Sequence, residues 1–282
     1  MLGKLFKHEW RAASRMLLLI HGCVLLFAVL TRIFLEVGGG IDIALSSDAN
    51  NIVQVIAALL MMGIMLLIFC TAMFTYIYIG YRFYKNVFTT QGYLTNTLPV
   101  TPTQIIFSKG LVALLWMILD VIILIAAFLI IFADPSFFMA LAEAWNHFLA
   151  IDIQIQPFVW IFLILVILSP FDLIAHMYFS VALGNLFAGH KILGAIVAYF
   201  GTQFIIQILS TVVLGVTGFA LNPFISAQYG SMSSDAAAEA GLSIINSIMN
   251  PFMIVMLVFS LLCILLFFFV TKYIMTKKLN LE

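Results

Sequence analysis

Residues 82–109 read RFYKNVFTTQGYLTNTLPVTPTQIIFSK and form the one long hydrophilic segment on the positively charged side of a very apolar chain. The segment carries Arg82, Lys85 and Lys109 and no acidic residue, and aromatic residues are spaced along it. A connection of this length in a compact protein usually has a function. We predict that it is a docking surface for another protein. The alternative is a solvated linker whose aromatic side chains anchor it at the lipid headgroups.

The composition is that of a membrane protein. Hydrophobic residues make up 65% of the 282 residues, charged residues make up 9%, and the mean hydropathy is +1.20. An ordinary soluble domain is about 45–50% apolar and about 25% charged. The formal net charge is zero, so no overall positive field attracts nucleic acid. The three cysteines lie inside apolar runs, which suits small buried hydrophobic residues.

Six apolar runs reach the length of about 20 residues that a helix needs to cross the hydrocarbon core. They occupy residues 17–35, 52–79, 110–132, 158–183, 192–219 and 252–274. Backbone polar groups inside a bilayer must be satisfied within their own segment, which favours helices. We predict an all-α integral membrane protein with a single transmembrane domain of six helices.

The distribution of cations predicts the orientation. Eleven of the twelve Lys and Arg residues lie at the N-terminus, in the 82–109 segment, at Lys191 and in the C-terminal tail, which are alternate connections. The other three connections carry Asp and Glu instead. The positive-inside rule therefore predicts that both termini are cytoplasmic. Arg32 is the exception, and Glu36 one helical turn later can pair with it.

Residues 1–15 have the pattern of an amphipathic elbow helix on the membrane surface. The apolar face carries Leu2, Leu5, Phe6, Trp10 and Ala13, and the other face carries mostly Lys4, Lys7, His8, Arg11 and Arg15. Such a helix is expected to lie on an anionic leaflet in contact with membrane lipids. A cleaved signal peptide is the competing interpretation, but no convincing small-residue cleavage site follows.

Two outer connections are predicted to contain structure. Asp134 followed by Pro135 is typical of a helix start, and apolar residues then recur at helical spacing as far as Leu149. Residues 221–250 are bracketed by two Asn-Pro pairs, at Pro223 and Pro251, and include an alanine-rich piece after Asp235 that suits a second short helix. We predict that this second connection is a broken segment that acts as an external gate.

Helix signals also occur inside the 82–109 segment. Thr101, Pro102 and Gln104 form a capping box with proline at the first helical position, so the third membrane helix should begin there. Residues 82–88 should prolong the second membrane helix beyond the bilayer. Residues 92–99 should then turn the chain back.

At GYLTNTLPV, preceded by RFYKNVF and followed by TPTQIIFSK, the sequence resembles the membrane subunits of ATP-binding-cassette exporters of the type-2 class. The N-terminal KLFKHEWRAASR is similar to the basic elbow helix that opens members of that family. Those relatives often carry an acidic residue or two just before Gly-Tyr-Leu, where this chain has Thr89, Thr90 and Gln91.

The resemblance implies a bacterial permease of the cytoplasmic membrane that works as a homodimer or heterodimer with a separate ATPase subunit. The 82–109 segment would be the coupling helix in a groove of that ATPase. The docking residues would be Arg82, Lys85, Phe88, Gly92, Tyr93 and Leu94. No G-x-x-x-x-G-K-[ST] motif occurs in the chain, so ATP and Mg²⁺ are expected on the partner and no cofactor is expected in this chain.

Two carboxylates lie inside apolar runs, Asp120 and Asp172, each roughly 15–18 Å deep at about 1.5 Å per residue. His176 lies one helical turn after Asp172 and can hydrogen-bond to either acid. An ionisable group at this depth indicates a polar point in a transport path or a proton relay. The alternative is a structural contact between the third and fourth membrane helices.

Two further sets of residues are candidates for a translocation path. The fifth apolar run has a polar stripe that should face protein or water: Gln203, Gln207, Ser210 and Thr217. The second run carries three adaptable side chains that suit an apolar substrate: Met61, Met62 and Met65. Internal packing is the alternative for both sets.

No common catalytic or metal-binding motif occurs, since H-E-x-x-H, C-x-x-C and G-x-S-x-G are all absent and the five histidines are scattered. We therefore expect no catalytic residues and no metal site. The predicted function is export of an apolar or amphipathic substrate, such as a peptide, drug or lipid, powered by a separate ATPase. An ion-coupled secondary carrier that uses Asp120 and Asp172 is the alternative.

Overall fold

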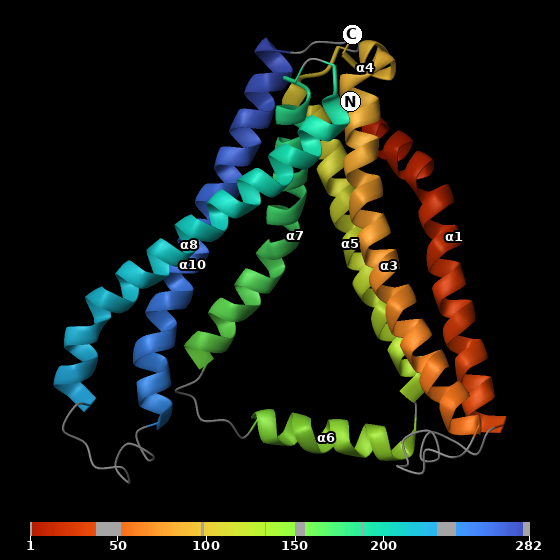
Figure 1. Ribbon diagram of the computed structural model, residues 1–282, viewed down its shortest axis with the longest axis vertical. Helices are drawn as coiled ribbons and strands as arrows, with labels where there is room; N and C mark the ends of the chain where they lie inside the picture. Colours follow the sequence, from red (N-terminus) through yellow and green to blue (C-terminus); the bar gives the residue numbers. More distant parts are fainter. Residues whose placement is uncertain are drawn as a thin grey trace. The chain divides into compact units, whose positions relative to one another are not determined.

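The structure is a computed structural model that describes residues 2–37, 52–96, 99–132, 134–149, 156–187, 189–229 and 241–278. The described residues form eight helices and no strand (Figure 1). The six long helices are α1 (Leu2–Val37), α3 (Ile52–Phe88), α5 (Pro102–Phe132), α7 (Gln156–Gly184), α8 (Lys191–Tyr229) and α10 (Gly241–Lys277). The two short ones are α4 (Thr90–Asn96) and α6 (Pro135–Leu149). All six long helices are long and apolar enough to cross a membrane. The predicted all-α fold with six membrane helices is confirmed, and the chain is a multi-pass membrane protein.

Local capping signals predicted several helix ends correctly. α3 continues past its apolar run to Phe88, α5 begins at Pro102, and α6 begins at Pro135. Proline suits the first helical position because the N–H that it lacks would have no partner within the helix. The chain between α3 and α5 does more than turn, since α4 is a helix of 7 residues.

Both ends of the connection predicted as a gate, residues 221–250, are helical. α8 runs through Pro223 to Tyr229, and α10 runs from Gly241 through Pro251. A proline removes one backbone hydrogen bond from a helix, but no water is available inside a bilayer to satisfy the others, so helical geometry persists around it. Pro170 likewise lies inside α7, which Figure 1 shows as a bent helix. The rest of the predicted gate, including its alanine-rich piece, lies in residues 230–240, outside the described residues.

By its contacts the chain divides into two compact units. Unit 1 comprises Met1–Arg82 and Gln104–Phe148, and unit 2 comprises Phe83–Thr103 and Leu149–Glu282. Unit 1 therefore holds α1 and most of α3, of α5 and of α6. Unit 2 holds α4, α7, α8 and α10. The 82–109 segment is shared, because its middle belongs to unit 2 and its two ends belong to unit 1.

In unit 1, α1 and α5 run parallel and meet through polar contacts at three levels. The contacts are Glu9 with Lys109, His21 with Asp120, and Arg32 with the backbone carbonyl of Ile131. The partners are 100, 99 and 99 residues apart. Successive levels are 11 or 12 residues apart on each helix, which is about three turns. All three contacts therefore lie on one face of each helix.

Apolar side chains fill the space between these levels. Ala13 and Leu17 of α1 pack with Val112 and Trp116 of α5 between the first and second levels. A second cluster contains Val24, Ala28, Leu35, Ala57, Ile64, Ala127 and Ile131. The small side chains of Ala28 and Ala127 are 0% exposed. They let the helix backbones approach closely, which is how membrane helices gain packing energy.

Residues 2–15 do not form a separate helix but are the first turns of α1, which are inclined to the rest of α1 in Figure 1. Part of their apolar face packs within the protein, and its predicted place on the membrane surface stays a prediction. Phe6 and Trp10 pack against the cluster around Trp116, and the Trp10 and Trp116 ring centroids are 5.0 Å apart. The cations of the opposite face, including Lys4 and Arg11, are exposed.

Unit 2 is joined by close backbone contact and by aromatic rings. A Cβ atom placed on Gly184, at the end of α7, would lie 2.3 Å from the backbone nitrogen of Ala195 in α8. Only glycine fits that contact. Phe267 of α10 packs against Phe179 of α7, with centroids 4.7 Å apart. The C-terminal turn of α3 joins this unit because Phe83 stacks on Tyr178 at 3.9 Å.

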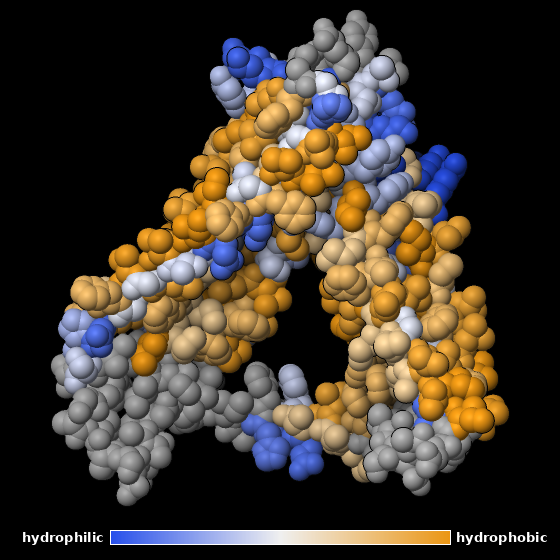
Figure 2. Space-filling view, in the orientation of Figure 1, coloured by the Kyte–Doolittle hydropathy of each residue, from blue (hydrophilic) through white to orange (hydrophobic). Residues whose placement is uncertain are grey.

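Hydrophobic residues cover much of the described surface of both units (Figure 2). Large apolar side chains such as Leu19, Phe204 and Phe219 are 64%, 67% and 84% exposed. Contiguous apolar surface of this extent is rare on soluble monomers. It suits helices whose outer faces contact lipid or other membrane helices.

Candidate functional site

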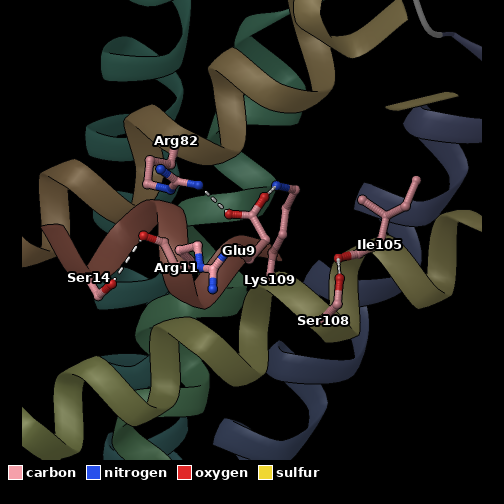
Figure 3. A network of polar contacts seen from close by, with 7 residues as sticks. All are labelled: Glu9, Arg11, Ser14, Arg82, Ile105, Ser108 and Lys109. Carbon is pink, nitrogen blue, oxygen red and sulfur yellow. Dashed lines mark hydrogen bonds and ion pairs between the residues drawn. The ribbon is translucent and has the colours of Figure 1, made fainter. Parts of the chain in front are cut away.

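A buried ionic cluster joins both ends of the 82–109 segment to α1. One carboxylate oxygen of Glu9 accepts a hydrogen bond from Arg82 Nη2 at 2.5 Å, and the other pairs with Lys109 Nζ. Figure 3 shows the Glu9 carboxylate between the two cations. The three side chains are only 12%, 18% and 7% exposed. Breaking a buried pair by removing one partner typically costs 3–5 kcal/mol, because the remaining charge is left without compensation.

The structure places Arg82, one of the predicted docking residues, in this cluster. Both Arg82 and Lys109 are paired with Glu9 and fix the base of the segment. Lys85, by contrast, has an exposed side chain. Glu9 was not identified as a candidate from the sequence, although it is the only acidic residue among the cations of residues 1–15.

Phe88, another predicted docking residue, is buried within the protein. Its side chain is 0% exposed and meets the Phe83 ring edge-on at 5.8 Å. Phe88 therefore anchors the segment to its own chain. Gly92 is buried within α4. The side chains of Tyr93 and Leu94 lie outside the described part of the structure, so their docking role stays a prediction.

A polar cluster lies near the middle of α1, α3 and α5. His21 Nε2 pairs with Asp120 Oδ1, and Thr75 Oγ1 donates to the same oxygen at 3.0 Å. His21 Nδ1 lies 2.6 Å from the carbonyl oxygen of Leu17. The His21 side chain is 2% exposed and Asp120 is 15% exposed. We call these three residues, His21, Thr75 and Asp120, the central cluster.

Unit 2 buries its own histidine in different surroundings. His176 Nε2 lies 2.7 Å from Thr202 Oγ1 of α8. The His176 ring stacks on the rings of Tyr199 and Phe267, with centroids 4.5 Å and 5.1 Å away. Asp172 Oδ1 is buried without a hydrogen-bond partner among the described residues. The hydrogen bond of His176 thus goes to a hydroxyl on another helix.

The predicted meeting of Asp120 with Asp172 and His176 stays a prediction, because these residues belong to different units. The described hydrogen bonds of Asp120 lie within unit 1, and that of His176 lies within unit 2. His21 was missed from the sequence. Its only sequence signal is a histidine inside an apolar run, and the 99 residues that separate it from Asp120 carry no local pattern.

The candidate path residues lie on two helices. On α8, Gln203 and Gln207 are exposed, whereas the hydroxyls of Ser210 and Thr217 donate to carbonyls of their own helix at 2.9 and 2.8 Å. The outward amides suit a neighbouring chain or water, because an amide is costly in lipid.

On α3, Met61 packs in the apolar cluster of unit 1, and Met62 and Met65 are 63% and 67% exposed. Met62 and Met65 are therefore the more accessible to a substrate or to lipid, and Met61 is partly buried. A path through these residues stays a prediction.

Comparison of the chain with protein-family models, with curated proteins and with solved structures finds no match. Among the described residues, no group of three or more His, Cys, Asp or Glu side chains could hold a metal ion.

Proposed function

We propose that the chain is the membrane subunit of an ATP-binding-cassette exporter of the type-2 class. The observation that carries this proposal is the construction of the 82–109 segment. α3 extends beyond its apolar run, α4 follows as a separate short helix, and Glu9 holds Arg82 and Lys109 at the base. A segment built this way presents a short helix on a rigid support, which suits a coupling element.

The division of the segment between the two units supports a role in transmitting movement. Residues 83–103 belong to unit 2, whereas Arg82 and Lys109 are tied to α1 of unit 1. Phe83 stacks on Tyr178 of α7. The chain is therefore held by α1 up to Arg82 and by α7 from Phe83 onward.

The exporter would work with both termini in the cytoplasm of a bacterium and would pair with a second, similar subunit. The partner ATPase would bind ATP and Mg²⁺. The exposed residues Met62 and Met65 would contact an apolar or amphipathic substrate. The outward amides of Gln203 and Gln207 suit a subunit interface or a water-filled path.

The test is whether an ATPase accompanies the protein from its native host. We expect the wild-type chain to co-purify with an ATP-binding-cassette ATPase in mild detergent. The amount of ATPase that co-purifies with a Tyr93→Ala/Leu94→Ala variant should be at least ten-fold lower, since a few apolar anchors usually dominate an interface. The matched control is Phe138→Ala/Leu141→Ala, which removes two exposed apolar side chains from α6.

Retention of the ATPase by the Tyr93/Leu94 variant would contradict the docking role of α4. Absence of any ATPase from the wild-type preparation, with transport still driven by an ion gradient, would contradict the exporter.

The alternative of an ion-coupled secondary carrier is favoured by one observation, the contact of a histidine and a carboxylate near the middle of membrane helices. In proteoliposomes such a carrier would follow an ion gradient without ATP. Its transport would be lost in Asp120→Asn or Asp172→Asn, whereas transport by the exporter would require the ATPase.

A further inference from the structure

The hydrogen bonds of the central cluster show where its protons lie, because each bond needs one donor and one acceptor. The carbonyl oxygen of Leu17 carries no hydrogen, so His21 Nδ1 must be the donor across their 2.6 Å contact. A neutral imidazole has one protonated nitrogen. With that proton on Nδ1, Nε2 of a neutral His21 is an acceptor.

Nε2 of His21 faces Asp120 Oδ1 within hydrogen-bonding distance. If Asp120 were a carboxylate and His21 were neutral, two acceptors would point at each other. A proton must therefore lie between them. It resides either on Nε2, as an imidazolium beside a carboxylate, or on Asp120, as a carboxylic acid beside a neutral imidazole. Both arrangements contain the same number of protons, and Thr75 donates to Oδ1 in both.

We propose that His21 and Asp120 together form a proton-binding site that holds one proton and joins α1 to α5 near the middle of the membrane helices. The proton comes from water and is bound without any other bond changing. When it leaves, the one remaining imidazole proton can serve only one of the two contacts of His21, so release of the proton requires either the contact with Asp120 or the contact with the Leu17 carbonyl to open locally. This inference does not depend on the exporter function.

Charge balance also indicates that the pair of His21 and Asp120 holds this proton. Without the proton the pair carries one negative charge, and with it the pair is neutral, which is the favourable state for side chains inside a bilayer. The nearest described charges along these helices are Arg15 of α1, 6 residues before His21, and Arg82 of α3, 7 residues after Thr75, roughly 9 and 10 Å away at 1.5 Å per residue. The Arg15 side chain is exposed and Arg82 is paired with Glu9. The Arg32–Glu36 pair lies 11 or more residues from His21 along α1.

The remaining neighbours of the site are uncharged or already engaged. α5 contributes the Trp116 ring, whose centroid is 5.7 Å from that of His21. α3 contributes Thr75 and, one turn later, the titratable Tyr78, whose ring lies under the Arg82 guanidinium at 5.9 Å. Asp120 is more exposed than His21, 15% against 2%.

The test reads the protonation of His21 directly. The full-length protein, with ¹⁵N in its histidine rings, is placed in lipid nanodiscs, and the ring nitrogens are followed by NMR as the pH is raised. The loss of a signal in His21→Gln identifies His21. We expect His21 to carry a proton on Nδ1 at neutral pH and the pair to release a single proton on titration. A bare Nδ1 at neutral pH in the wild-type protein would overturn the proposal.

Asp120→Asn is the informative variant, because an asparagine amide donates to Nε2 as a protonated Asp120 would. This variant should fold, keep the proton on Nδ1 of His21, and show no titration of the site. His147 serves as the matched control. Its Nε2 lies 3.9 Å from Glu143 Oε1, and its side chain is 80% exposed. His147→Gln should therefore leave the titration of His21 unchanged.

A second readout uses stability. Folded protein that binds one proton more than unfolded protein loses stability as the pH rises. The equilibrium constant for unfolding should increase up to ten-fold per pH unit above about pH 6.5, where a free histidine is neutral. This dependence should disappear in Asp120→Asn and persist in His147→Gln. An equal pH dependence in wild type and Asp120→Asn would refute the site.

Discussion

The two units join their helices by different physical means. In unit 1, α1 and α5 meet through charged or polar side chains at three levels, with alanine and leucine between them. In unit 2, α7, α8 and α10 meet through stacked rings and through the contact of Gly184 with Ala195. Charged contacts respond to pH and to the loss of one partner, whereas ring and backbone contacts respond mainly to changes of volume.

The two buried histidines illustrate this difference. His21 faces a carboxylate and a carbonyl, so its hydrogen bonds require an additional proton. His176 lies beside Thr202, whose hydroxyl donates to the Ala198 carbonyl at 2.7 Å and therefore accepts from Nε2. A neutral His176 satisfies that bond. The same residue type is thus a proton-binding group in unit 1 and a flat packing group with one hydrogen bond in unit 2.

The largest effect is expected from Glu9→Gln in unit 1. The change removes the negative charge and leaves Arg82 and Lys109, which are 18% and 7% exposed, without compensation. We expect the free energy of unfolding to fall by roughly 3–5 kcal/mol. Thermal or denaturant unfolding in detergent measures it.

The control for this variant is Glu36→Gln, because Glu36 also pairs with an arginine but is 61% exposed. It should cost about 1 kcal/mol or less. Equal losses in the two variants would mean that the ionic cluster of Glu9 does not stabilise unit 1.

A smaller effect is expected from Gly184→Ala in unit 2. The new Cβ would lie 2.3 Å from the backbone nitrogen of Ala195, so α7 and α8 must move apart. Overpacking of this kind costs typically 1–3 kcal/mol. Gly201→Ala, in the same unit, has nothing within 4 Å of the added atom and should be neutral or slightly stabilising in the same unfolding assay. A neutral Gly184→Ala would show that the close contact of the two helices is dispensable.

The positions of the helices could be predicted from the sequence because they depend on local properties. Hydropathy locates the six spans, and the Thr101–Pro102 pair locates the start of α5. The Asn-Pro pairs do not mark the limits of the helices, since α8 continues through Pro223 and α10 includes Pro251.

The candidate site was harder to predict because it depends on how each helix is rotated about its own axis. A helix that is apolar on every side carries little periodic signal for that rotation. From the sequence, His176 could be paired with either Asp172 on its own helix or Asp120 on another, and nothing in the pattern pointed to His21 or Thr202. His21 and Asp120 meet because α1 and α5 keep a constant offset over three levels. Phe88 is buried for a similar reason, since Phe83 on the same helix packs within unit 2.

The smallest effect is expected from His176→Phe. Phenylalanine retains a flat ring between Tyr199 and Phe267, and Thr202 keeps its hydrogen bond to the Ala198 carbonyl. The loss is one side-chain hydrogen bond, about 1 kcal/mol, and it should not change with pH above about 6.5, where a histidine of the unfolded chain is neutral. His21→Phe should cost more, because it leaves Asp120 without its partner at the middle of the membrane helices. Unfolding of both variants across a pH series compares them directly. Equal and pH-dependent losses would mean that His176, too, binds a proton, and the distinction between the units would fail.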